Sequence, residues 1–552
     1  MAATPAAAQK PTPGAISPLE QVRTSATALL REQKAEEALE LVFSALDSVL
    51  RKSRELELLV AKLRRERLGQ KSERIDPAQL ALLFEELQRQ GDGSLAVDVQ
   101  AEERVDAELD EQIKAAEQVR AAKGKSRSGK QPKSRASFPN AKLCVHQAEI
   151  AQEDLACPQC GKARQNIGED VARRVEYIPG HFEMHEHHLP KYGCTSCREG
   201  VVSAPGPQRV LERSIAGASL LAHVVVAKYV DHTPLHRLHA SYARVGAEIP
   251  VSTLSDWVGN VADVLEPIAT RLEQRVLAAH VVRTDATGLK VLDPHSPKNI
   301  ERGTIWVYLG DDRDVVFRYS RTGEGATGPW QFLAGRDGPI QADGASVFDR
   351  LFNGQVANAI EVGCFAHARR KLIELQDTDC RVAYPIKLIA RIYRIEHLAD
   401  ARECTPSDRA ALRQERTQEI LDQLKRWALV THASEPPSSD LAKAAAYMLN
   451  QWNALTRFVT DGRLSPDNNL TESQLRSIAL GRKDYLFAGS HDAARRAAVL
   501  YTITRTCALR GVPPLAYLTD VLPKLANAWP QSRIDELLPG NWQPAPETTT
   551  AQ

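Results

Sequence analysis

The chain has 552 residues, 43% of them hydrophobic and 26% charged, which is typical of a soluble globular protein with several domains. Its net charge of +1 does not by itself indicate a nucleic-acid or membrane partner. The longest apolar stretch, 220–230, is too short to cross a bilayer, and residues 1–18 lack the basic flank and apolar block of a signal peptide. We therefore expect a cytoplasmic protein.

The first 142 residues divide into three segments by composition. Residues 1–16 are rich in Ala, Pro and Thr and are expected to be disordered. Residues 17–120 are dominated by helix formers, and their apolar positions predict a short coiled coil that joins two or more copies of the chain. A single amphipathic helix packed on its own domain is the alternative, because only about three heptads are sustained. Residues 121–142 carry seven Lys and Arg and no acid, which predicts a flexible basic linker suited to phosphate contacts.

Two Cys-x-x-Cys pairs follow, in residues 143–205. They are Cys157 with Cys160 and Cys194 with Cys197. Two such pairs are the ligand set of a closed tetrahedral Zn²⁺ site, in which the metal has a structural role. Their separation exceeds the usual range, so we expect a β-rich loop between them, and histidines at 185, 187 and 188 are alternative ligands. Free thiols or a redox pair remain the other interpretation.

Residues 206–275 read as helical. Amphipathic segments at 219–229, 235–243 and 252–264 are separated by turns, and a glycine-containing turn precedes the third. This order indicates a helix-turn-helix, with Ser252, Thr253 and Ser255 near the start of the recognition helix and Ser252 or Thr253 as its N-cap. A three-helix packing unit without a DNA role fits equally well, since the third segment is not basic.

Residues 276–500 predict a mixed α/β domain. An apolar run ends in Asp285 and is followed by a Thr-Gly turn and a second run at 289–292, which predicts a β-hairpin that presents an acid. Strand runs at 303–309 and 315–319, an amphipathic stretch and a strand ending at Asp343 come next. This is the order of a ribonuclease H-like core, whose first and fourth strands are neighbours. Taken singly, each Asp is explained as well by a turn.

Further polar motifs follow the strands. Cys364 and His367 have a metal-ligand spacing, but no second ligand pair lies near them in the sequence, which favours buried packing. A helical insertion is expected at 376–458. Beyond it, Asp467 is placed to cap a helix that carries Glu472 one turn in, and Arg476 is a salt-bridge partner for that Glu in the simplest structural interpretation.

The end of this domain is basic and aromatic. Arg482, Lys483 and Tyr485 lie in a predicted loop and are candidate DNA contacts. Residues 501–552 are expected to form a C-terminal helical region and a disordered tail.

Distinctive blocks run along most of the chain. They include LRRERLGQKSERI, the GEDV-containing Cys-x-x-Cys segment, AKYVDHTPLHRL through STLSDWV, VRTDATGLKVL, QADGASVF, VGCFAHARRKL, SPDNNLTESQLRSIALGRKDYLFAGS and PLAYLTDVL. In these blocks the chain resembles the transposases of the insertion sequence 66 family. One departure concerns the first acid, because the family commonly has Asp-Glu-Thr where this chain has Asp285-Ala286-Thr287.

The resemblance implies a DDE-type enzyme on a ribonuclease H-like fold, with Asp285, Asp343 and Glu472 as its acids. These would hold two Mg²⁺ ions, with Mn²⁺ as a substitute, for cleavage at the element ends and strand transfer into target DNA. The implied partners are double-stranded DNA, both at the terminal inverted repeats of the element and at the target, further copies of the chain, and small companion proteins. The implied location is the nucleoid in the cytoplasm. A non-catalytic zinc-containing repressor or accessory factor is the alternative; a coiled-coil scaffold explains only the N-terminal region.

Overall fold

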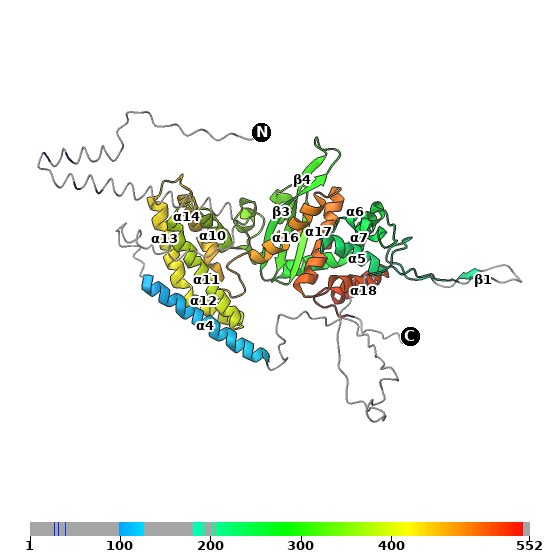
Figure 1. Ribbon diagram of the computed structural model, residues 1–552, viewed down its shortest axis with the longest axis horizontal. Helices are drawn as coiled ribbons and strands as arrows, with labels where there is room; N and C mark the ends of the chain where they lie inside the picture. The colour runs from blue at the N-terminus through cyan, green and yellow to red at the C-terminus, as the bar shows by residue number, and fades with distance from the viewer. Residues whose placement is uncertain are drawn as a thin grey trace, which may run out of the picture.

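The computed structural model describes residues 99–125, 180–189, 191–193, 201–203 and 206–544, together with positions 27, 31, 39 and 43. Most of the predicted coiled coil and basic linker, and all four predicted zinc cysteines, lie outside these residues. The described part is a mixed α/β structure with a helical majority. Figure 1 shows a sheet with its flanking helices beside a separate group of helices. No described helix is both long and apolar enough to cross a membrane.

Three helices precede the sheet. They are α5 (Ala218–Tyr229), α6 (Leu235–Ala243) and α7 (Val251–Ala278). The first two match the predicted segments, but α7 is 28 residues long and ends where a strand was predicted to begin. The predicted N-cap is also wrong: Pro250 occupies that position without a side-chain bond, and Ser252 and Thr253 lie inside the helix. The third predicted helix is thus a long one that continues to the sheet.

The central sheet has five strands in the order β5-β4-β3-β6-β7. They are β3 (Val282–Leu292), β4 (Ile300–Gly310), β5 (Asp314–Ser320), β6 (Pro339–Gln341) and β7 (Ile360–Val362). The first three form an antiparallel meander, whereas β6 and β7 run parallel to β3. The first and fourth strands of this sheet in chain order, β3 and β6, are therefore neighbours, as the strand pattern predicts.

The hairpin predicted within 282–292 is wrong. Residues 282–292 form one continuous strand, in which Gly288 pairs with Thr304 of β4. The Arg482 guanidinium donates a hydrogen bond to the Gly288 carbonyl oxygen. A Cβ added at position 288 would meet its nearest neighbour, the Gly303 carbonyl oxygen, only at 4.0 Å, so this contact does not require glycine.

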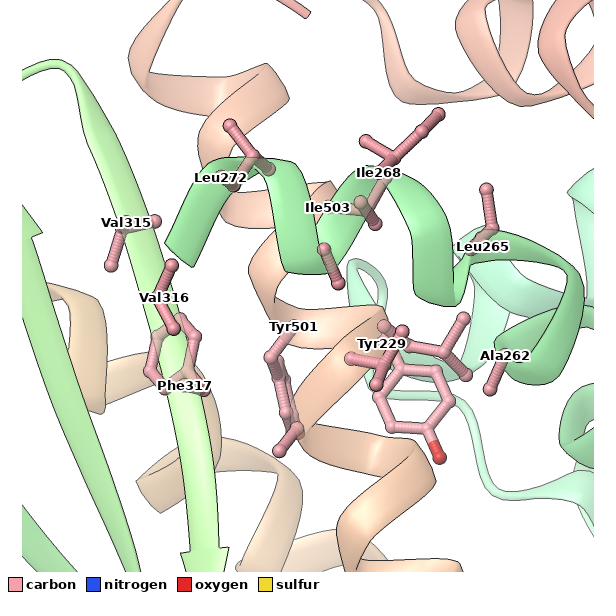
Figure 2. Packing of buried hydrophobic residues seen from close by; sticks show 14 of the residues in the cluster. Tyr229, Ala262, Leu265, Ile268, Leu272, Val315, Val316, Phe317, Tyr501 and Ile503 are labelled. Carbon is pink, nitrogen blue, oxygen red and sulfur yellow. The ribbon is translucent and has the colours of Figure 1, made fainter. Parts of the chain in front are cut away.

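The free edge of β5 is covered by α17 (His491–Leu509). The Val315 and Phe317 N–H groups donate to the hydroxyl oxygens of Thr506 and Thr502, at 3.3 and 2.9 Å. Figure 2 shows apolar side chains of α7, β5 and α17 packed in one core around Tyr501. Covering an edge in this way removes a row of unpaired backbone groups that would otherwise recruit another strand.

A second group of helices has its own hydrophobic core. It comprises α10 (Phe365–Ile373), α11 (Ala383–Ala401), α12 (Pro406–Arg416), α13 (Gln418–Ser434), α14 (Asp440–Asn450) and α15 (Trp452–Thr456). The helical character predicted for the insertion is confirmed. We call this group, with α4 added to it, the helical unit.

The N-terminal helix α4 (Val99–Lys125) lies along α11 (Figure 1). Leu109 and Ile113 enter the core of the helical unit, and Asp106 forms ion pairs with Arg391 and Arg394. The start of the predicted basic linker is helical, because α4 continues to Lys125.

The remaining elements frame the sheet and the zinc segment. Helix α16 (Asn469–Tyr485) lies on β3 and β4, and α18 (Pro514–Ala526) packs on α5 and α7. Strands β1 (Lys191–Gly193) and β2 (Val201–Ser203) pair antiparallel and flank the second Cys-x-x-Cys in the sequence.

Candidate active site

Two carboxylates come from neighbouring parallel strands. In the β3–β6 pair, Arg283 is opposite Gln341. Asp285 lies two residues after Arg283, and Asp343 lies two residues after Gln341. Equal steps along parallel partners lead to the same level of a sheet, here just past the carboxyl end of β6, so the strand register itself brings these two acids together.

Local backbone contacts orient both acids. An Asp285 side-chain oxygen accepts the Ala286 N–H at 2.7 Å, and an Asp343 oxygen accepts the Ala345 N–H at 3.0 Å. The chain turns after Asp343 at Gly344, whose φ of +76° suits glycine. The Tyr447 hydroxyl of α14 donates to the Asp343 carbonyl oxygen at 3.0 Å, which ties this turn to the helical unit.

The third acid, Glu472, lies in the first turn of α16. The N-cap of this helix is the fully buried Asn468, whose amide nitrogen donates to the Thr284 carbonyl oxygen at 3.0 Å. The predicted cap, Asp467, instead accepts the Asn469 N–H at 3.0 Å. The start of α16 is thereby held against β3, one residue from Asp285.

Glu472 pairs with residues of α10. Its Oε2 lies 3.2 Å from Arg370 Nη2, and its Oε1 lies 3.7 Å from His367 Nδ1. Among the described residues no ion pair joins Glu472 to Arg476, so the i,i+4 pair weighed from the sequence is wrong. The Glu472 carboxylate therefore points toward α10 and not toward Arg476 on its own helix.

The two other acids act electrostatically on Asp285. Its pKa is raised to about 6, mainly by burial and also by the charges of Asp343 and Glu472, which outweigh the lowering effects of the Ala286 N–H and Arg370. Among the described residues, the carboxylate oxygens of the three acids do not all lie within 4.8 Å of one another. One donor atom each of Glu472, Cys364 and His367 does lie within 4.8 Å of the other two. Asp285 is therefore a carboxyl group in a buried, negatively charged environment.

Several buried polar atoms around these acids have no hydrogen-bond partner among the described residues. They are Thr284 Oγ1, Gln341 Oε1, Asn468 Oδ1, Thr471 Oγ1 and Glu472 Oε1. Native proteins satisfy nearly all buried polar groups, so unpaired oxygens gathered at one place suggest a site for polar or charged ligands.

Sequence reasoning missed the residues that support the acids. Gln341 donates from its amide nitrogen to the Gly363 and Ser465 carbonyl oxygens, at 2.9 and 2.8 Å, and so joins β6 to the loop before α16. Arg370 and His367 contact Glu472 across a separation of about a hundred residues in the chain. Two features of the sequence could have pointed to these residues: Gln341 directly precedes Ala-Asp-Gly, and a basic run follows His367. Neither feature identifies the residue that is contacted.

The predicted DNA contacts lie at two helix ends. Ser252 and Ser255 are exposed and Thr253 is half-buried in the first turns of α7. Arg482, Lys483 and Tyr485 form the last turn of α16, so the predicted loop is wrong.

Both helix ends border one cavity of about 430 Å³, which Ser255 and Tyr485 line together with Lys228 of α5. Lys228 Nζ lies 4.7 Å from the centre of the Tyr485 ring, and burial lowers the pKa of this amine to about 8. The Tyr485 hydroxyl is hydrogen-bonded to that of Tyr501. Tyr485 is consequently a packed wall of the cavity rather than a free side chain.

Comparisons with known proteins cover the described site and the zinc segment. A model described as "Transposase IS66 family" matches residues 213–496, which include all three acids. The "zinc-finger binding domain of transposase IS66" matches 154–198, which include all four predicted zinc cysteines, and the "IS66 C-terminal element" matches 502–539.

Full-length relatives are also found. "Uncharacterized protein y4hP" of Sinorhizobium fredii is 32% identical over 518 residues, which cover 90% of each chain. "Uncharacterized protein y4qI" of the same organism is 32% identical over 435 residues, or 76% of this chain and 80% of the relative. The similarity thus extends from the zinc segment through the sheet to the C-terminal helices, and the chain belongs to the IS66 family of transposases.

Proposed function

We propose that this protein is a DDE transposase that cleaves DNA at the ends of its element and transfers the freed strand into target DNA. Asp285, Asp343 and Glu472 are the acids of this proposal, and the mixed five-stranded sheet is its ribonuclease H-like core. The observation that carries it is the β3–β6 register, which brings Asp285 and Asp343 to the same level of the sheet, next to the start of α16.

The donor set fits hard divalent cations. Carboxylate oxygens are the ligands that Mg²⁺ and Mn²⁺ prefer, and a cation would offset the burial and the neighbouring negative charges that raise the pKa of Asp285. When bound there, such ions activate a water or 3′-hydroxyl and stabilise the leaving oxygen of a phosphodiester. Asp285 and Asp343 would hold them from fixed backbone positions, whereas Glu472 would complete the set from α16.

Neighbouring residues have separate roles in this proposal. Arg370 orients Glu472 through the 3.2 Å ion pair. Asn468 and Gln341 hold α16 and its preceding loop against the two strands through buried hydrogen bonds. No side chain of the chain is required as a covalent nucleophile.

DNA would run from the acids toward the cavity bordered by α7 and α16. Ser252, Thr253, Ser255, Arg482 and Lys483 lie at the helix ends around this cavity, and Tyr485 forms part of its wall. The basic segment 121–142 and the zinc module, with Cys157, Cys160, Cys194 and Cys197 as Zn²⁺ ligands, would add contacts. Copies of the chain would associate through the part of the region 17–120 that precedes α4, because α4 itself packs on α11.

The test uses DNA that carries the inverted repeats flanking the gene. Asp285→Asn and Asp343→Asn should abolish Mg²⁺- or Mn²⁺-dependent cleavage but retain binding of the same DNA. Asp337→Asn, an exposed acid on the loop before β6, is the matched control and should cleave normally. Undiminished cleavage by either site variant contradicts the assignment. Tight, repeat-specific binding without cleavage by the unaltered protein favours the non-catalytic DNA-binding alternative.

A further inference from the structure

Three potential metal ligands of different chemistry meet between α10 and α16, and one of them is also a candidate acid of the active site. Cys364 is the N-cap of α10, His367 lies in its first turn, and Glu472 comes from the first turn of α16. One donor atom from each of the three lies within 4.8 Å of the other two. The Cys-x-x-His spacing supplies two of these ligands, and the fold supplies the third from a distant part of the chain.

Two of the three donor atoms face each other without bonding. His367 Nδ1 and Glu472 Oε1 are 3.7 Å apart, both atoms are buried, and neither has a hydrogen-bond partner among the described residues. Ligands of a tetrahedral Zn²⁺ at bond lengths near 2.1 Å are about 3.4 Å apart, close to the observed separation. Little movement is needed for one cation to satisfy both atoms.

The Cys364 sulfur is buried and lies close to backbone N–H groups. Cys364 is 1% exposed, and its Sγ accepts the Asn468 N–H at 3.2 Å. The N–H groups of Ala366 and His367 at the start of α10 also favour the thiolate, although burial prevails and raises the pKa of the thiol to about 11. A thiol in such a place loses its proton when a soft cation binds, since the metal replaces the proton as the positive partner.

We propose that Cys364, His367 and Glu472 form a binding site for a thiophilic divalent cation of the Zn²⁺ type, with three protein ligands and an open fourth position. The site differs in chemistry from the all-carboxylate set of Asp285, Asp343 and Glu472, because thiolate and imidazole select softer ions than Mg²⁺.

The two sites share Glu472. An ion bound to Cys364 and His367 draws this carboxylate toward α10, so Zn²⁺ occupancy competes with completion of the carboxylate set. This consequence rests on the proposed function, but metal binding itself requires only the three side chains. Binding and cleavage are therefore measured separately.

The binding test is metal stoichiometry on the full chain. After equilibration in a Zn²⁺ buffer and gel filtration, the unaltered protein should retain about two Zn²⁺ per chain, one of them in the Cys-x-x-Cys module. Cys364→Ser and His367→Gln should each retain about one. Cys404→Ser, a half-buried cysteine elsewhere in the helical unit, is the matched control and should retain about two. With Co²⁺ as the probe, Cys364→Ser should lower the thiolate-to-metal charge-transfer absorption, and Cys404→Ser should not.

Equal Zn²⁺ content in the unaltered protein, Cys364→Ser and His367→Gln overturns the proposal, and so does equal loss in Cys404→Ser. Circular dichroism and thermal melting establish that each variant is folded, and if Cys364→Ser is not, His367→Gln decides. Where cleavage is measurable, the Zn²⁺ concentration for half-inhibition should rise at least about tenfold in Cys364→Ser. An unchanged inhibition curve refutes the shared-ligand consequence. Loss of one Zn²⁺ in a protein that never cleaves DNA supports this site and contradicts the proposed catalysis.

Discussion

Arg413 offers the sharpest test of how the helical unit supports the candidate site. Its guanidinium is 1% exposed and forms a two-bond contact with Glu396, each bond 2.7 Å long. The same group donates to the carbonyl oxygens of Phe458, Asp461 and Leu464, at 2.6 to 2.9 Å. This single side chain therefore fixes the loop that leads into α16 and Glu472.

Replacing Arg413 by Met should destabilise the helical unit by about 3–4 kcal/mol. Breaking a buried ion pair typically costs about 3–5 kcal/mol, and three carbonyl oxygens also lose their charged donor. The lower part of that range applies because Glu396 keeps Arg409, at 2.9 Å, as a partner. At about 2–4 °C per kcal/mol, the melting temperature should fall by about 6–16 °C. Arg413→Lys should lower the free energy of unfolding roughly half as much, because lysine keeps the charge but not the planar guanidinium with its several donors.

The assay is thermal unfolding of the full chain, with trypsin cleavage after the exposed Arg463 as a local probe of the loop. Arg413→Met should speed this cleavage and lower DNA cleavage. Arg416→Met is the control, since its ion pairs with Glu415 and Glu108 lie at the surface and are worth less than about 1 kcal/mol. If Arg413→Met lowers the melting temperature no more than Arg416→Met does, the reasoning is refuted.

Two further substitutions test the packing around the sheet and the loop. Gly462→Ala should lower the free energy of unfolding by at least about 1–3 kcal/mol, because the added Cβ would clash with the Pro406 carbonyl oxygen. Gly489→Ala, with open space around it, is the control, and equal melting temperatures of the two variants would disprove the clash. Thr506→Val should lower the free energy of unfolding by about 1–3 kcal/mol, because it leaves a buried N–H of the β5 edge unpaired. Thr519→Val, at the surface, is the control and should melt within about 1 °C of the unaltered protein. Similar drops in the melting temperature of both variants would contradict the role of Thr506 at the edge.

The sequence indicated the strand order well because each strand is a local feature. Alternating or continuous apolar runs of β-branched residues mark β4 and β5, and Asp343-Gly344 marks the turn after β6. The pattern also indicated that the first and fourth strands are neighbours, which the register confirms. Local chemistry was therefore enough to mark the two acids, whereas their pairing was expected from the strand order of a ribonuclease H-like core.

Errors arose where a distant contact overrides a local signal. Gly288 was interpreted as a turn residue, but Arg482 approaches its carbonyl oxygen and the strand continues. Tyr485 was interpreted as a loop aromatic, but its contacts with Lys228 and Tyr501 place it in a packed helix end. The partners of Glu472 were likewise hidden, because residues on two helices about a hundred positions apart leave no spacing pattern in the sequence.

The docking of α4 on α11 has a consequence for the order in which the protein is made. The Asp106–Arg391 contact joins residues 285 positions apart, and α4 contributes few apolar side chains to the core it meets. At about 5–20 residues per second, a ribosome needs roughly 15–60 s to add the partner after α4 has emerged. During that interval the acidic helix has no arginines of α11 to pair with, so α4 cannot dock until a segment made much later has been synthesised.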